Sequence, residues 1–239
     1  NKKFYVPNNA TLVVAGDIDF VTTKKMIQDY FGPIPRGADV TKNFPQEDPI
    51  TQAMSAKGYD PNIQIPAIMA AYRTPSMKTK DSRILDMIST YLSTGRSSVL
   101  YKKLVDTKKM ALQAGAINLS QEDYGTYILF GLPQGETKLE DIIKEIDEEI
   151  VKMQTELISE RNFQKLQNQF ENNFVNSNSS VEGIANSLAR YNVLYGDTNL
   201  INSEIEIYRS ITREDIKAVA NKYLNPNQRL ILEYLPEEK

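Results

Sequence analysis

The chain has 239 residues, of which 28 are lysine or arginine and 31 are aspartate or glutamate, and it contains neither histidine nor cysteine. A net charge of −3 without a dominant basic cluster argues against nucleic-acid binding, and no apolar run is long enough to cross a bilayer. Without imidazole or thiol groups, the usual catalytic triads, thiol nucleophiles, disulfides and the commonest zinc ligands are excluded from this chain.

The first part of the sequence predicts a strand, a helix and a linker. Residues 10–16 form a short apolar, β-branched run that ends in glycine, which is typical of a buried strand. Asp19 can cap a following helix, and Gly32-Pro33 stops it. Residues 33–55 are rich in proline and polar residues and predict a linker or an extended connection.

The rest of the sequence predicts a mixture of strands and helices. Pro66 indicates that the first strand of this part either lies at a sheet edge or starts late. The expected elements, in chain order, are a strand within 62–73, helices near 79–93 and 96–108, a β-hairpin of 110–119 and 124–133, helices near 137–154, after Ser159, at 181–195, 200–210 and after Thr212, and a strand at 228–235. The predicted class is α+β, with an antiparallel-rich mixed sheet and helices packed on one face.

Two local patterns give more specific predictions. The helix near 137–154 has an apolar face and a run of acidic residues, Glu145 to Glu149, which we expect to face solvent. Thr212 and Asp215 resemble a capping box with aspartate in place of the usual glutamate or glutamine.

The two ends of the sequence resemble each other. The segment Phe4 to Asn9 precedes the first predicted strand, and the segment Tyr223 to Gln228 precedes the last. Both segments begin with an aromatic residue and contain a Pro-Asn pair three residues later. A chance match over so few residues is an alternative, but a true match indicates a tandem duplication in a longer protein. Asn1-Lys2-Lys3 is also not a typical natural start, so we expect this sequence to be part of a longer chain.

Standard catalytic motifs do not match. The segment from Gly32 to Gly37 has the glycine spacing of a phosphate loop, but it lacks the Lys-Ser/Thr that must follow and contains prolines, which lack amide donors. Gly95-Arg96-Ser97-Ser98 lacks the second glycine of a nucleophile elbow. A catalytic pair of carboxylates remains an alternative, although paired acids on amphipathic helices are more often exposed to solvent.

The segment Ser93 to Ser98 joins two predicted helices with small residues, one glycine and one arginine. In one interpretation it is a flexible surface that meets a peptide through backbone groups and Arg96. In the other it is a helix–helix turn in which Ser97 caps the second helix.

Three segments carry a resemblance to a known family. The segments are Phe4 to Asp19 with Tyr30 to Pro35, Gly95 to Ser98 with Leu100 to Leu104, and Thr212 to Ile216 with Ala220 to Leu224. In order and spacing they resemble the M16 (insulinase, or pitrilysin-like) zinc peptidases. The resemblance implies the LuxS/MPP-like metallohydrolase fold, with two homologous halves that face each other across a chamber.

The resemblance also implies where the chemistry lies. The first half of such proteins carries His-x-x-Glu-His and a distal glutamate, so zinc is expected in a missing N-terminal half or a partner subunit and none in this chain. The residues implied to bind substrate are Gly95, Arg96, Ser97, Ser98 and Tyr101. Active members often supply an arginine and a tyrosine beyond this loop, but this chain has Val105 and Leu112 there, which puts that role in doubt.

We therefore expect residues 1–36 to be the tail of a preceding homologous half, 37–55 a linker, and 56–239 the non-metal C-terminal half. This half would enclose a peptide or unfolded polypeptide in a zinc-dependent endopeptidase, and it would not be catalytic alone. The alternatives are a non-catalytic subunit or scaffold of the same fold, with a homologous subunit as partner, and an unrelated α+β binding domain. Composition points to a bacterial protein, and the compartment stays open between the cytoplasm and the periplasm.

Overall fold

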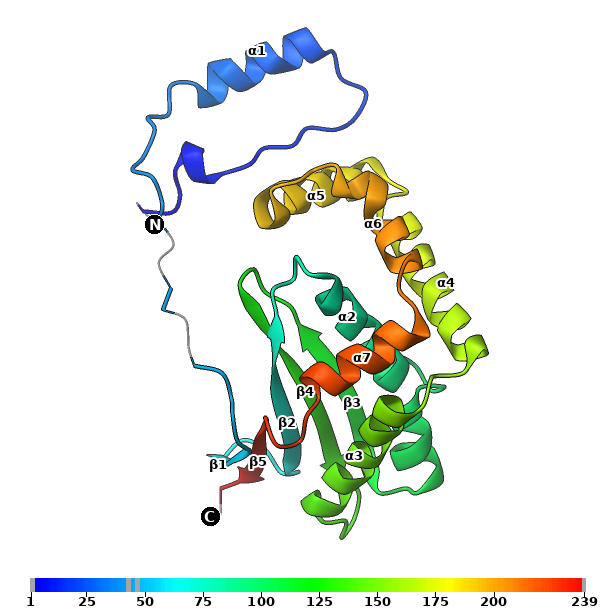
Figure 1. Ribbon diagram of the computed structural model, residues 1–239. Helices are drawn as coiled ribbons and strands as arrows, with labels where there is room; N and C mark the ends of the chain where they lie inside the picture. Colours follow the sequence, from blue (N-terminus) through cyan, green and yellow to red (C-terminus); the bar gives the residue numbers. More distant parts are fainter. Residues whose placement is uncertain (1–2, 42–43, 46–47, 238–239) are drawn as a thin grey trace. The chain divides into compact units, whose positions relative to one another are not determined.

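The computed structural model describes residues 3–41, 44–45 and 48–237. The chain divides into two compact units, one formed by Asn1–Glu47 with Phe170–Ile205 and the other by Asp48–Gln169 with Glu206–Lys239 (Figure 1). Every buried apolar side chain of the described residues lies in the second unit, between Ala67 and Leu166 or between Ile211 and Leu224.

The second unit is built on a five-stranded sheet in the order β1-β5-β2-β4-β3. Its strands are β1 (Met54–Asp60), β2 (Ala67–Pro75), β3 (Ala111–Leu119), β4 (Tyr124–Pro133) and β5 (Leu230–Pro236). The pair β1–β5 is parallel and the other neighbours are antiparallel, which confirms the predicted antiparallel-rich mixed sheet.

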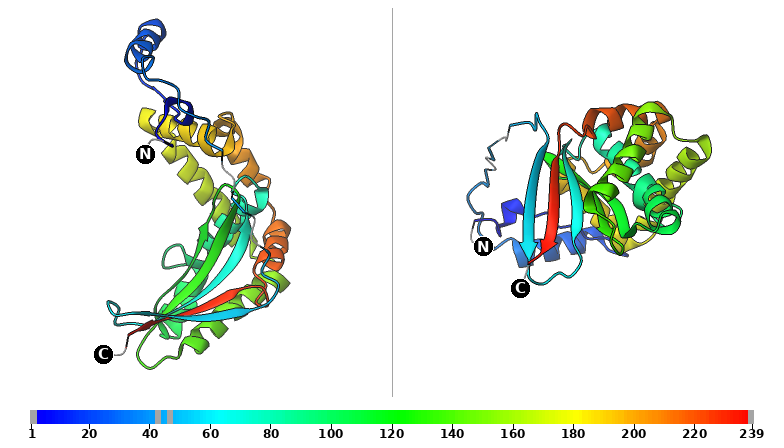
Figure 2. Two further views of the ribbon diagram at one scale, coloured as in Figure 1. Left: turned by 90° about the vertical axis from the view of Figure 1, so that its left-hand side faces the viewer. Right: turned by 90° about the horizontal axis from the view of Figure 1, so that it is seen from below.

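Helices cover one face of this sheet. The helices of the second unit are α2 (Lys80–Ser93), the π-helical segment η2 (Tyr101–Thr107), α3 (Leu139–Thr155), the first half of α4 (Glu160–Ser177) and α7 (Arg213–Tyr223). Figure 2 shows α2, α3 and α7 on the same side of the strands, with the opposite face turned away from them. The α+β class with helices on one face is therefore confirmed.

Helix boundaries follow the sequence signals closely. The Thr79 side chain accepts a hydrogen bond from the Ser82 amide at the start of α2, and Thr212 and Asp215 form both hydrogen bonds of the predicted capping box at the start of α7. The amphipathic face of α2 packs into the core, where Leu85, Ile88 and Leu92 are fully buried. The second helical stretch starts at Val99, three residues later than predicted.

The first unit contains η1 (Pro7–Asn9), α1 (Phe20–Phe31), the second half of α4, α5 (Val181–Arg190), η3 (Tyr191–Tyr195) and most of α6 (Leu200–Arg209). Asp19 caps α1 by accepting a hydrogen bond of 2.8 Å from the Thr22 amide, as predicted. Neither α1 nor α5 has a buried residue.

One strand prediction is wrong, and another is confirmed in one of its two alternatives. Residues 10–16 do not form a strand, and Leu12 and Val14 are exposed, since no described strand pairs with this segment. The strand predicted within 62–73 starts late, at Ala67 after Pro66, which is one of the two predicted alternatives, and its central place in the sheet excludes the other.

The prediction of a solvated acidic face on α3 is wrong for Glu145, Asp147 and Glu149, whereas Glu148 is exposed. Glu145 and Glu149 both lie within 3.0 Å of Lys103 Nζ, and their side chains are only 13% and 11% exposed. Asp147 is paired with Arg229. Because these acids have cationic partners on neighbouring elements, they tie α3 to η2 and to the start of β5 and do not face water.

Candidate functional site

The loop between α2 and η2 is a sharp turn built around Gly95. The Thr94 amide still donates to the Thr90 carbonyl, at 3.0 Å, so the helical hydrogen bonds continue to that residue. Gly95 then adopts a φ of 77°, in the left-handed region that favours glycine, and the Ser98 amide donates back to the Gly95 carbonyl at 3.0 Å. These residues therefore form a turn between the end of α2 and the following helical segment.

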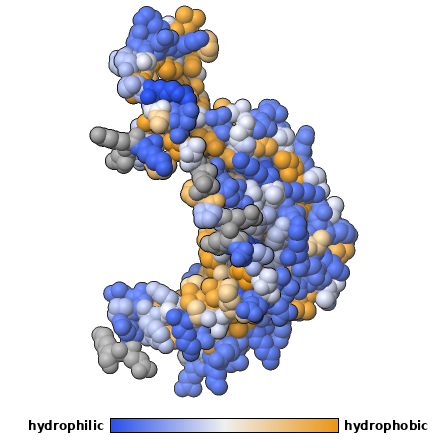
Figure 3. Space-filling view, turned by 60° about the vertical axis from the view of Figure 1, so that its left-hand side comes forward, coloured by the Kyte–Doolittle hydropathy of each residue, from blue (hydrophilic) through white to orange (hydrophobic). Residues whose placement is uncertain are grey.

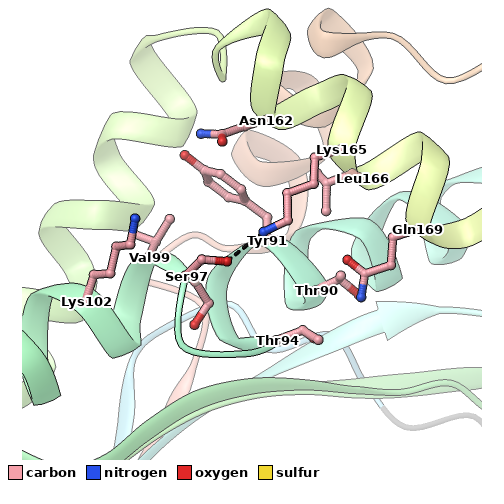
Figure 4. Close-up of a pocket in the computed structure, with 11 residues that line it drawn as sticks. Thr90, Tyr91, Thr94, Ser97, Val99, Lys102, Asn162, Lys165, Leu166 and Gln169 are labelled. Atoms are coloured by element: carbon pink, nitrogen blue, oxygen red, sulfur yellow. Dashed lines mark hydrogen bonds between the residues drawn. The ribbon is translucent and has the colours of Figure 1, made fainter.

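The five predicted site residues fall into two groups. Ser97 and Ser98 line a cavity of about 160 Å³ (Figure 4). Gly95 and Arg96 are exposed, Tyr101 is half-buried, and none of the three lines this cavity. The structure therefore brings together two of the five residues and places the others around the turn.

The opposite wall of the cavity comes from α4, which sequence reasoning did not connect with the loop. Lys165 Nζ lies 2.6 Å from Ser97 Oγ and donates a hydrogen bond to it. Burial raises the pKa of the Tyr91 hydroxyl above its usual value, and the nearby Asn162 side chain partly opposes this effect. Ser97 and Lys165 are 68 positions apart in the sequence, and no local signal predicts their contact.

A second candidate surface is the sheet face that the helices leave uncovered. Side chains alternate along β4, where Tyr127 and Leu129 are fully buried and their neighbours Ile128 and Phe130 are half-buried. Figure 3 shows apolar residues gathered on the lower part of the surface, over the strands. The register places these apolar side chains on the uncovered face: Met69, Ala71, Ile117, Leu119, Ile128, Phe130, Leu230 and Leu232.

Strand β3 forms one edge of this surface. In the order of the sheet it has a neighbour on one side only, which is β4. The end of α2 lies against β3, where Ser93 Oγ donates a hydrogen bond of 2.9 Å to the Ala116 carbonyl. The candidate loop and the edge strand are therefore adjacent.

The described residues do not fit a zinc site. No group of three or more acidic side chains among them could hold a metal ion. The acids of lowest exposure on α3 are held by Lys103 and Arg229. The resemblance places Val105 and Leu112 where active members have an arginine and a tyrosine. Val105 is half-buried and Leu112 is exposed, and neither carries a polar side-chain group.

No helix in the described part of the chain combines the length and apolar character of a membrane span.

Together, the fold and surfaces define an α+β domain that presents an open apolar sheet face and no metal centre in its described residues. Residues 2–170 match the family described as "Peptidase M16 inactive domain". The chain belongs to this family.

Relatives and solved structures agree with this assignment. The chain is 24% identical over 227 residues to the zinc protease PqqE of Helicobacter pylori, and the match covers 94% of this chain and 51% of that protein. The crystal structure of a protease from Helicobacter pylori superposes with a TM-score of 0.88 at 23% identity, covering 98% of this chain and 57% of that one. The peptidase M16 inactive domain from Pseudomonas fluorescens gives a TM-score of 0.77 at 13% identity, covering 93% and 53%. The chain thus spans about half the length of the curated relative it matches.

Proposed function

We propose that this chain is the substrate-enclosing, C-terminal half of an M16-type zinc metalloendopeptidase that acts on peptides or unfolded polypeptides. The zinc site lies in a preceding half, outside this chain, and that half supplies the hydrolytic chemistry. The observation that carries the proposal is an uncovered apolar sheet face in a chain that belongs to the M16 inactive-domain family.

The uncovered face suits an unfolded polypeptide better than a small molecule. It is broad and apolar, with Ile117 and Leu119 each about 45% exposed. Unfolded chains expose apolar side chains of many kinds, so a surface without narrow specificity can hold them. Strand β3 has a neighbouring strand on one side only, and an extended peptide can add to such an edge.

Residues 1–36 support the presence of a preceding half. Helix α1 has five large apolar residues that are more than half exposed: Phe20, Val21, Met26, Tyr30 and Phe31. A helix with so much exposed apolar surface is expected to pack against another body. Because the chain spans about half of its curated relative, we assign that body to the preceding half of the same polypeptide.

The test uses the whole protein, the preceding half included, with fluorescein-labelled casein as an unfolded substrate. Ile117→Lys places a charge on the uncovered face, and we expect it to lower kcat/KM about tenfold, since losing one central apolar contact costs more than about 1 kcal/mol. Val151→Lys is the matched control: Val151 is 50% exposed and Ile117 44%, but Val151 lies on α3. We expect the control to change kcat/KM less than about twofold.

Equal losses in the two variants would contradict the assignment of the uncovered face to substrate. A whole protein that binds casein through this face without cleaving it would instead favour a non-catalytic subunit of the same fold.

A further inference from the structure

Residues 11–15 combine a strong strand sequence with an unpaired backbone. Their sequence, Thr-Leu-Val-Val-Ala, is apolar and rich in β-branched residues, yet Leu12 is 55% exposed and Val14 is 43% exposed. No described residue hydrogen-bonds to the backbone of this segment, and its contact with Asn192 is made by the Thr11 side chain. Figure 1 shows the segment as a stretch without helix or strand between η1 and α1. Because apolar strands in folded proteins have their amides and carbonyls paired, this segment lacks its neighbours.

The turn that precedes this segment occurs again near the other end of the chain. In the first turn the Asn9 amide donates to the Val6 carbonyl at 2.9 Å, and in the second the Gln228 amide donates to the Asn225 carbonyl, also at 2.9 Å. Each turn has Pro-Asn as its two central residues, a pair that favours this conformation. The two ends of the sequence therefore share a backbone hydrogen bond at the same position as well as similar residues.

The segment that follows the second turn is β5, which lies in the interior of the sheet. When the two turns are aligned, Leu12 and Val13 correspond to Ile231 and Leu232 of β5. Strand β5 lies between β1, to which it is parallel, and β2, to which it is antiparallel. Because the chain spans about half the length of the curated relative it matches, neighbours of this kind for residues 11–15 have a place in the other half.

We infer that residues 11–15 form a strand in the sheet of the preceding half, in the place that β5 takes in this half. The strand lies between two neighbours, parallel to one and antiparallel to the other, and both sides of its backbone are paired. Leu12 and Val14 face one side of that sheet and Val13 and Ala15 the other, so both apolar sets leave water. The inference rests on the preceding half that the proposed function requires, and it names the element of this chain that the half holds.

The test is hydrogen–deuterium exchange of the whole protein, the preceding half included, followed at single amides by mass spectrometry. Successive amides of an interior strand donate to neighbours on opposite sides, so all of them are protected. We expect each amide of residues 12–15 to exchange at least about a thousandfold more slowly than those of residues 38–41. Residues 38–41 are the internal control, because their amides also donate to no described group.

A pair of proline variants tests the same strand through stability. Val13 and Val40 are both half-buried and lie in segments without helix or strand. Because proline removes a hydrogen bond from an interior strand, we expect Val13→Pro to lower the Tm of the whole protein by about 6–10 °C. The matched variant Val40→Pro should lower it by less than about 2 °C.

Three results would overturn the inference: exchange of residues 12–15 as fast as that of residues 38–41, protection of every second amide only, which is the pattern of an edge strand, or equal losses of Tm in the two proline variants. Casein cleavage decides the proposed function separately. A whole protein that cleaves casein while residues 12–15 exchange fast retains the proposed function and contradicts the inference. Protected residues 12–15 in a whole protein that does not cleave casein support the inference and contradict the proposed function.

Discussion

Phe31→Ala is expected to destabilise the whole protein by about 3 kcal/mol and to leave the stability of residues 1–239 alone almost unchanged. Phe31 is 52% exposed in this chain, so truncating it here removes little buried surface. If α1 packs against a preceding half, the same side chain is buried in the whole protein, and its loss leaves a cavity. Urea unfolding of both proteins, followed by circular dichroism, measures the difference.

The control for this prediction lies on the same helix. Lys25 is 75% exposed and forms a surface pair with Asp29, so Lys25→Ala should change the stability of either protein by less than about 1 kcal/mol. A Phe31→Ala effect that is equally small in both proteins would show that α1 does not pack on an upstream half, and it would remove the support that residues 1–36 give to the proposal.

Arg229→Met is expected to lower the free energy of unfolding by about 3 kcal/mol. The Arg229 side chain is 10% exposed and pairs with both carboxylate oxygens of Asp147, the second at 2.8 Å. It also donates to the Tyr72 hydroxyl at 2.9 Å. Burial lowers the pKa of Arg229, but the hydrogen bonds and the negative charge of Asp147 outweigh it and raise that pKa overall. Removing the guanidinium leaves the partly buried carboxylate without its partner, which is the main cost.

The double variant Arg229→Met, Asp147→Leu separates the two contributions. Because it removes both charges, we expect it to recover at least half of the lost free energy in the same urea experiment. A double variant as unstable as the single one would contradict this explanation and would assign the cost to packing at β5.

Most helices of this protein follow from local sequence patterns. The apolar spacing of α2 and its cap at Thr79 set its position, and Thr212 with Asp215 sets the start of α7. The β3–β4 hairpin is equally local, since Gln121 to Asp123 join two β-like runs. In each case the determining residues lie within about one or two turns of each other, so periodicity and capping suffice.

The elements that were missed depend on partners far along the chain. Strand β1, with the sequence Met-Ser-Ala-Lys-Gly-Tyr-Asp, has no clear strand pattern, and it forms by pairing with β5, which follows more than 160 residues later. Residues 10–16 show the opposite case, in which a strong strand pattern has no described partner strand. Strand formation requires a neighbour as well as suitable residues.

The same distinction applies to the candidate site. Residue types in the loop 94–98 predicted a turn, and the positive φ of Gly95 agrees with it. The cavity, however, depends on Lys165 and Asn162 from α4 and on the burial of Ser98, which follow from tertiary packing. The acids of α3 were assigned to solvent because their partners, Lys103 and Arg229, lie on other elements.

The most direct test of the central proposal is the zinc content of two purified proteins after dialysis, measured by mass spectrometry. We predict about one zinc ion per molecule of the whole protein and none bound stoichiometrically by residues 1–239 alone, because a catalytic zinc site needs about three protein ligands. Stoichiometric zinc in residues 1–239, or none in an active whole protein, would contradict the assignment of this chain as the non-metal half of a zinc peptidase.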